Sequence, residues 1–141
     1  MSLTINSLGD NPQTPGIYAE TYAPDQLIAG NHKLVTDSVT VLSGQVLQRG
    51  AVLGKITASG KYVLALNTAA DGSQSPAAIA VDYIDASAGD VAGGVYLAGE
   101  FNGAALILGA GITLASATAT LRPLSIYIKA VSLALSSADP T

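Results

Sequence analysis

The sequence predicts a small, mainly β domain with one short helix packed on it and an extended N-terminal arm before it. Three observations predict this fold class. After Pro24, short runs rich in Val, Ile, Leu, Thr and Tyr are separated by frequent glycines, which is typical of strands joined by turns. Apolar residues recur at helical spacing in one stretch, residues 114–121. Residues 1–23 show neither period, and 141 residues correspond to one domain with room for such an arm.

The arm is polar and interrupted by glycine and proline, so it cannot build a hydrophobic core by itself. It nevertheless contains more apolar side chains than a solvated linker needs: Leu3, Ile5, Leu8, Ile17, Tyr18 and Tyr22. Two interpretations stay open, a free terminus and an arm that becomes ordered by docking on a partner. Because the arm has no basic start and no continuous apolar run, it is not a secretory signal, and we expect synthesis in the cytoplasm. The folded domain is expected over residues 24–141.

The first half of this domain is predicted to contain four strands. Residues 33–42 alternate Val35, Asp37, Val39 and Val41 with Leu34, Thr36, Ser38 and Thr40, which predicts a strand whose register is set by the face that becomes buried. Short strands are expected at residues 46–47 and 51–56. A turn at residues 59–61 leads into residues 62–66, so an antiparallel hairpin is the simplest arrangement for this part of the chain.

The second half is predicted to contain four more strands and the helix. A loop at residues 67–76 precedes them, and a second loop lies around residues 85–90. Thr113 is a candidate N-cap for a helix over residues 114–121, and Pro123 prevents its continuation. The predicted strands of this half are residues 77–81, 91–97, 104–108 and 124–131.

Charged residues are scarce and slightly more often acidic than basic. They make up 11% of the chain against about 25% in typical domains, 49% of the residues are hydrophobic, and the mean hydropathy is +0.43. We therefore expect part of the surface to be covered by other subunits. The net charge is −4 and the six basic residues are scattered, which argues against binding to nucleic acid or to an anionic membrane. Cysteine is absent, which excludes disulfides and thiolate chemistry.

One uncharged stretch, between Glu100 and Arg122, is long enough to cross a bilayer. It contains Asn, Gly, Ser and Thr at short intervals, so turns that join short buried elements explain it better than a membrane span does.

Two glycine motifs resemble ligand-binding loops but fail in their details. Gly54 and the pair Gly60-Lys61 have the wrong spacing for a phosphate-binding loop, and Tyr62 stands where a Ser or Thr would hold magnesium. Residues 109–111, Gly-Ala-Gly, lack the third glycine of a dinucleotide-binding motif. Both are interpreted as turns.

No arrangement of residues supports catalysis either. His32 is the single histidine and could act as a base for Ser43 or Ser59, but no nucleophile elbow frames these serines. Glycoside cleavage would need aromatic residues to stack on sugars, and the chain has no Trp and one Phe. Three acids could supply ligands for calcium, but their spacing fits no known loop: Asp82, Asp85 and Asp90. We therefore predict no catalytic residue, no metal site and no cofactor.

Six phrases stand in a characteristic order along the domain. They are Pro24-Asp-Gln-Leu-Ile-Ala-Gly-Asn31, Gly50-Ala-Val-Leu-Gly-Lys-Ile56, Ala58-Ser-Gly-Lys-Tyr62, Ser75-Pro-Ala-Ala-Ile79, Asp85-Ala-Ser-Ala-Gly-Asp90 and Gly99-Glu-Phe-Asn102. In this order they closely resemble the lambda-type head decoration proteins of tailed bacteriophages, over about residues 24–129.

The resemblance implies a compact, β-barrel-like or β-tulip-like domain and a structural protein of the virion, not an enzyme. Such a protein binds the outer surface of the expanded phage head as a homotrimer at threefold and quasi-threefold positions, and there it cements neighbouring major capsid subunits. It also implies that the arm lies on the capsid lattice, where it can pair with the capsid's strands. The arm residues expected to contact the capsid are Pro15, Gly16, Ile17, Tyr18 and Tyr22.

Two alternatives from other classes fit the same composition. A trimeric phage tail or fibre module would share the low charge but would not bind empty expanded heads. A barrel-like carrier or biosynthetic domain is suggested by the hairpin-like sequence of residues 44–56. Such a domain would need a lysine that can be modified at an exposed turn, yet Lys55 is predicted to lie in a strand.

Overall fold

The structure is a computed structural model that describes residues 26–130. The predicted arm, residues 1–23, and the end of the chain, residues 131–141, lie outside the described residues.

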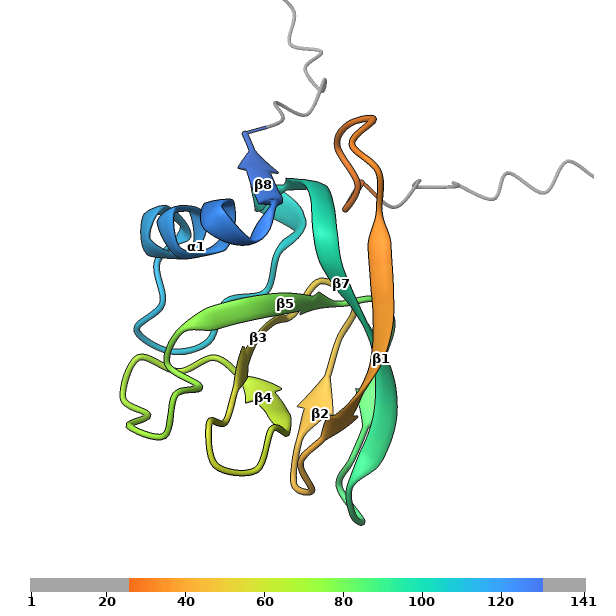
Figure 1. Ribbon diagram of the computed structural model, residues 1–141, viewed down its shortest axis with the longest axis vertical. Coiled ribbons are helices and arrows are strands. Elements are labelled where there is room, and N and C mark those ends of the chain that lie inside the picture. Colours follow the sequence, from red (N-terminus) through yellow and green to blue (C-terminus); the bar gives the residue numbers. More distant parts are fainter. Residues whose placement is uncertain (1–25, 131–141) are drawn as a thin grey trace, which may run out of the picture.

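Five strands close into a small barrel (Figure 1). They follow the order β1-β4-β3-β5-β7, and β1 also pairs with β7, so that the two ends of this order meet. The parallel pairing of β1 with β4 consists of one register pair, Val41 with Tyr62, whereas the other barrel pairings are antiparallel. The bounds of the barrel strands are β1 (Val35–Val41), β3 (Val52–Lys55), β4 (Tyr62–Leu64), β5 (Pro76–Ala80) and β7 (Val91–Asn102).

The long strand β7 joins the barrel to the rest of the domain. Its first part pairs with β1 and β5, and its last four residues pair in parallel with β8 (Ile126–Lys129). The second part begins at Gly99, whose φ is +148° and whose Cβ, if it had one, would lie 2.5 Å from a leucine methyl group. Glycine is therefore required at this bend. A separate two-stranded ribbon consists of β2 (Val46–Leu47) and β6 (Ile84–Asp85).

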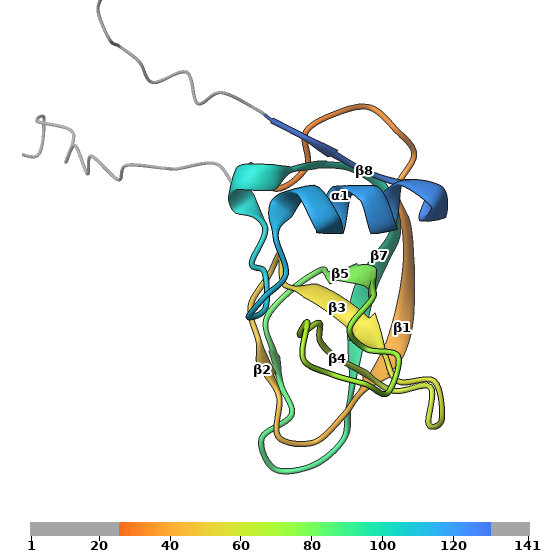
Figure 2. The same cartoon turned by 90° about the vertical axis from the view of Figure 1, so that its left-hand side faces the viewer.

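The helix α1 (Leu114–Leu121) lies across one end of the barrel, where it packs against β5 and β8 (Figure 2). Its N-terminus forms a capping box. The Thr113 side chain accepts the Ser116 N–H, and the Ser116 hydroxyl accepts the Thr113 N–H, each at 3.1 Å. A 3₁₀ turn, η3 (Arg122–Leu124), follows it and contains Pro123. Among the described residues α1 is the only α-helix.

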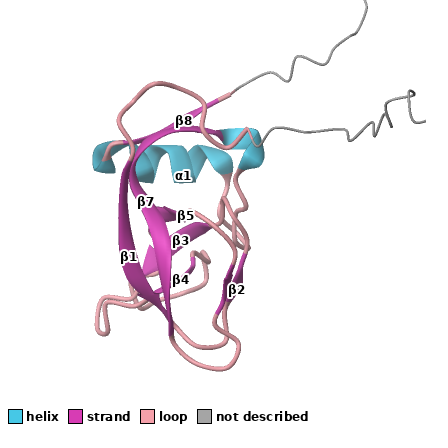
Figure 3. Ribbon diagram, turned by 90° about the vertical axis from the view of Figure 1, so that its right-hand side faces the viewer, coloured by secondary structure: helices cyan, strands magenta, loops and turns pink. Residues whose placement is uncertain are grey.

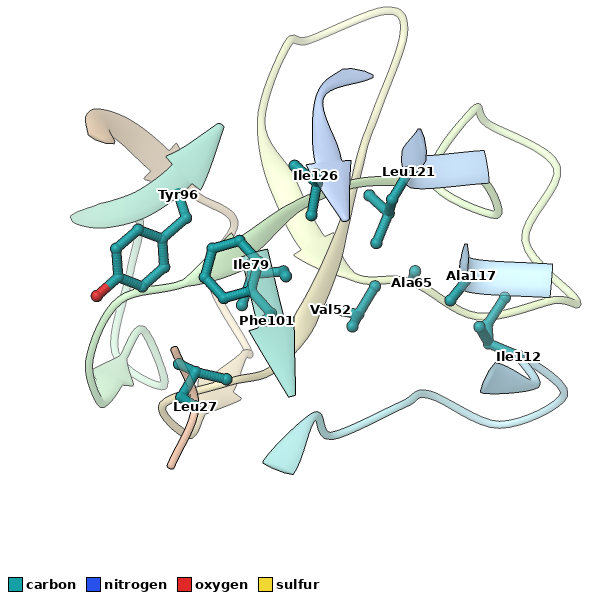
Figure 4. Close-up of a cluster of buried hydrophobic side chains, with 10 residues drawn as sticks. All are labelled: Leu27, Val52, Ala65, Ile79, Tyr96, Phe101, Ile112, Ala117, Leu121 and Ile126. Atoms are coloured by element: carbon teal, nitrogen blue, oxygen red, sulfur yellow. The ribbon is translucent and has the colours of Figure 1, made fainter. Parts of the chain in front are cut away.

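The core consists of two clusters on opposite faces of the same strands. Val52 and Leu53 are neighbours on β3 but belong to different clusters, as do Ile79 and Ala80 on β5. Burial on both faces explains why these strands consist of continuous apolar runs. The cluster next to α1 contains Leu27, Val52, Ala65, Ile79, Tyr96, Phe101, Ile112, Ala117, Leu121 and Ile126 (Figure 4). The other contains Val41, Leu47, Ala51, Leu53, Tyr62, Ala78, Ala80, Ile84, Ala86 and Val95.

The two ends of the domain differ in character. The helix α1 and strand β8 lie at one end, and the loops that join β1 to β2 and β6 to β7 lie at the other (Figure 3). At the loop end, the Asp90 carboxylate accepts the Ser43 N–H at 2.9 Å and the Lys61 ammonium at 2.6 Å, so three loops are joined there.

The predicted fold class is confirmed: the domain is mainly β, with a closed barrel and one short helix. The hairpin of residues 51–56 and 62–66 is confirmed as the antiparallel pair β3 and β4, and the helix has the predicted bounds and cap. The last predicted strand, residues 124–131, is shorter than predicted, because η3 occupies its first residue and β8 ends at Lys129.

The predicted strand over residues 104–108 is wrong. A 3₁₀ turn, η2 (Gly103–Ala105), stands there instead, and Ile107 makes one isolated bridge, to Ala51. The turn forms because the Asn102 side chain accepts the Ala104 N–H at 3.0 Å and so caps the chain where β7 ends. The strand predicted for residues 91–97 in turn continues to Asn102.

A short strand was also missed, since β6 begins at Ile84, before the predicted loop. No helix in the described range 26–130 is long and apolar enough to cross a membrane.

Candidate functional site

The five residues predicted to contact a partner, Pro15, Gly16, Ile17, Tyr18 and Tyr22, lie outside the described residues. The structure does describe the segment through which the arm joins the domain. We call this segment, residues 27–32, the arm root.

The first part of the arm root is attached to the end of β7. Leu27 is buried in the same core cluster as Phe101 (Figure 4), and its carbonyl accepts the Asn102 N–H at 2.8 Å. Ile28 forms an antiparallel bridge with Phe101, and the Ala29 N–H donates to the Glu100 carbonyl at 2.9 Å. The arm root therefore lies along β7 on the side opposite to β8.

The second part of the arm root is held by a side chain. The carboxylate of Glu100 accepts the backbone N–H of His32 at 3.1 Å, and on its other oxygen it accepts the ammonium of Lys129 in β8 at 2.9 Å. The backbone N–H of Asn31 also donates to it. The hydrogen bond from Lys129, followed by that from His32, lowers the pKa of Glu100 below its usual value.

The Glu100 side chain can reach the arm root because the backbone at Gly30 passes close to it. A Cβ at Gly30 would lie 1.8 Å from the Glu100 carboxylate oxygen, so any larger residue would displace the carboxylate. The ring of His32 meets the edge of the Tyr127 ring, with centroids 5.3 Å apart. His32 is exposed and lies beside Tyr127 of β8, whereas Ser43 lies in the loop after β1, beside Asp90.

These contacts bring the arm root and β8 to the same end of the domain. Leu27 meets Asn102 from one side of β7, and Lys129 is the register partner of Asn102 on the other side. The side chains that this end exposes include large apolar ones: Ile28, Leu34, Leu114, Leu124 and Tyr127.

The family model for the bacteriophage lambda head decoration protein D matches residues 17–127 of this chain. The chain belongs to this family. A comparison with curated proteins finds no match. The family match includes Ile17, Tyr18 and Tyr22 of the arm, whereas Pro15 and Gly16 precede it.

Membership in the head decoration family makes this protein a structural component of the phage capsid, not an enzyme. The predicted structural role in the virion is therefore confirmed. The family match covers the arm root, all of α1 and the first two residues of β8, whereas Ile128 and Lys129 follow it.

The acids that sequence reasoning weighed as calcium ligands each serve a backbone group in this decoration protein. Asp82 accepts the Tyr83 N–H at 2.8 Å, and Asp85 accepts the Ser87 N–H at 3.0 Å. Asp90 is paired with Lys61. Within residues 26–130, no three His, Asp or Glu side chains come together as a metal site would require.

The structure shows where the two lysines of the rejected phosphate-loop and carrier interpretations lie, Lys61 and Lys55. Lys61 follows the turn at Gly60, whose φ is +73°, and its ammonium binds Asp90. Lys55 lies in β3, as predicted.

Sequence reasoning missed Glu100 and Gly30 as members of one site. Both residues lie within the phrases that indicated the family, but the phrases stand far apart in the chain. The available signal was that Glu100 is a single acid before the uncharged stretch that ends at Arg122, and this did not show that Gly30 and His32 lie beside it.

Proposed function

We propose that this decoration protein binds the outer surface of the expanded phage head as a homotrimer, at threefold and quasi-threefold positions. There it cements neighbouring major capsid subunits against the pressure of packaged DNA. It is made in the host cytoplasm and ends in the virion, without binding nucleic acid or membrane. The observation that supports this proposal is the family match over residues 17–127.

A cement acts by binding one state of the lattice better than another. If the protein binds the closed, expanded lattice more tightly than a ruptured one, its binding free energy opposes the separation of capsomers. Three arms on one trimer act together, because binding of the first arm raises the effective concentration of the other two. Linkage of this kind raises the overall affinity by about a hundredfold or more.

The arm is proposed to make the main capsid contact through Pro15, Gly16, Ile17, Tyr18 and Tyr22. An extended arm of this length spans on the order of 70 Å, at about 3.3 Å per residue, which is enough to pass from one capsid subunit to the next. Its partly apolar sequence suits the addition of a strand to a neighbouring sheet edge.

The position of the arm root indicates which end of the domain faces the capsid. Since the arm root lies at the end that holds α1 and β8, we place this end on the capsid and the β1–β2 and β6–β7 loops away from it. The outer surface of α1 supports this orientation, because its side chains are mostly apolar or small: Leu114, Ala115, Thr118, Ala119 and Arg122.

The test is to mix purified full-length protein with expanded heads that lack decoration and to image them. We expect trimeric density at the threefold and quasi-threefold positions. Deleting residues 2–22 should leave melting nearly unchanged and abolish this density. Density at single sites elsewhere, or a stable dimer in sedimentation, would overturn the cementing role. Binding to tails alone would favour the alternative of a tail or fibre module.

A further inference from the structure

We propose that Glu100 is a positioning residue for the N-terminal arm: it clamps the arm root to β7 and β8 and so sets where the arm leaves the domain. This inference rests on the proposed function, in which the arm binds the capsid. It adds that the arm must start from a fixed point to bind well.

The first step of the argument is the geometry of the clamp. Glu100 lies on β7 with one carboxylate oxygen on the His32 N–H, at 3.1 Å, and the other on the Lys129 ammonium, at 2.9 Å. One side chain thus joins three segments that are distant in sequence: the arm root, β7 and β8. Without it, the arm root would be held by the buried Leu27 and by the short pairing of residues 27–29 with β7.

The second step concerns the force that passes through this segment. The arm joins the domain through the arm root, so any pull between capsid and arm is transmitted to the domain through residues 27–32. The pairing of residues 27–29 with β7 is short, and short segments at the edge of a fold are among its least stable parts. Charge-assisted hydrogen bonds from Lys129 and His32 raise the cost of opening it.

The third step is that an arm with a fixed starting point binds better than a free one. When the arm root is held, less conformational freedom is lost as the arm docks, and preorganisation of this kind strengthens binding. The gain is expected mostly in the rate of release, because variants of one interface differ more in their dissociation rate than in their association rate.

The structure offers two independent ways to break the clamp. Glu100→Gln removes the negative charge that binds the Lys129 ammonium and the His32 N–H of the arm root. Gly30→Ala keeps every clamp residue but inserts a Cβ 1.8 Å from the carboxylate oxygen, which displaces Glu100. Gly30 does not adopt a positive φ, so alanine adds no backbone strain there.

Each variant has a matched control at the loop end of the domain. The Asp90 carboxylate also accepts one lysine ammonium and one backbone N–H, so Asp90→Asn makes the same chemical change away from the arm. Gly89 has no atom within 4 Å of its built Cβ and no positive φ, so Gly89→Ala controls for the added methyl group.

The first measurement is hydrogen exchange on the free, full-length protein. In Glu100→Gln and Gly30→Ala, the amides of Asn31 and His32 should exchange about tenfold faster or more, while the barrel strands keep their protection. The two controls should leave these amides unchanged. Unchanged exchange in both clamp variants would overturn the clamp itself, whether or not the protein binds heads.

The second measurement is binding to undecorated expanded heads. Both clamp variants should bind about tenfold more weakly than wild type, mainly through faster release, with melting temperatures close to those of the controls. Lys129→Arg, which keeps the cation, should bind like wild type, and Lys129→Met should fall between wild type and Glu100→Gln.

The outcomes separate the two proposals. If wild type does not bind heads at all, the proposed function fails. If wild type binds and the clamp variants bind equally well in spite of a loosened root, the positioning role of Glu100 fails and the proposed function stands.

Discussion

The carboxylate of Asp37 accepts the backbone N–H of Ser38 at 2.8 Å, on an edge of β1 that no described strand covers. The N–H of Leu42, which donates to the Tyr62 carbonyl, marks the side of β1 that faces β4. Backbone groups of alternate residues point to the same side of a strand, so Ser38 faces this side too. Since β4 pairs with β1 only at Val41, the edge before Val41 is open among the described residues.

Removing this acid should expose the edge. Asp37→Ala frees the Ser38 N–H and takes away the single charge of β1, and both changes favour pairing with another strand. We expect greater self-association than wild type, measured by sedimentation at increasing concentration. Asp82→Ala is the control, since Asp82 also accepts the N–H of the next residue but lies outside the strands. Equal self-association of the two variants would show that another part of the assembly covers this edge.

The cap of α1 should contribute measurably to stability. Thr113→Ala removes the acceptor of the Ser116 N–H and should cost about 1 kcal/mol of unfolding free energy. Thr120 lies inside the same helix, where its hydroxyl donates to the Ser116 carbonyl, so Thr120→Ala should be neutral or stabilising because alanine has the higher helix propensity. Chemical denaturation compares the two variants, and equal losses would contradict the capping argument.

Two leucines near α1 provide a test of the core. Leu121 is fully buried in the cluster next to the helix, whereas Leu124, three residues later, is 46% exposed. Leu121→Ala should cost about 2 to 5 kcal/mol because it leaves a cavity. Leu124→Ala should change the unfolding free energy by about 0.5 kcal/mol at most. A large loss for Leu124→Ala in the isolated protein would mean that this side chain is covered by a neighbouring subunit.

The paired carboxylates predict how stability depends on acid. Hydrogen bonds from Lys129 and His32 lower the pKa of Glu100, and those from Lys61 and Ser43 lower the pKa of Asp90. Groups with a lowered folded pKa stabilise the fold above their unfolded values, 4.5 for Glu and 3.8 for Asp, and this contribution is lost as the pH falls through the folded pKa. The melting temperature should therefore fall below about pH 4, and the fall should be smaller in Glu100→Gln and Asp90→Asn. Identical acid profiles for wild type and both variants would contradict this assignment.

Much of the local structure could be predicted because short-range interactions decide it. The helix follows from the cap at Thr113 and the stop at Pro123, both within one turn of its ends. The hairpin of β3 and β4 follows from a turn at Gly60 between two apolar runs. The family likewise follows from short phrases in a fixed order, which the match over residues 17–127 confirms.

The errors occurred where distant segments compete for the same backbone groups. The strand predicted for residues 91–97 continues through Gly99 to Asn102, because β8 on one side and the arm root on the other pair with its last residues. Residues 104–108 have the composition of a strand, yet the buried Asn102 caps a 3₁₀ turn there.

The sequence by itself determined the β class, the helix and the family, because each depends on residue types and spacings within a few positions. Only the tertiary structure decided that β1 closes the barrel on β7 and that Leu27 and Lys129 flank Asn102. It also decided that Glu100 lies against Gly30. These pairings join residues far apart in the chain, and they form because burying the two apolar faces of the sheet leaves backbone groups that only those partners can satisfy.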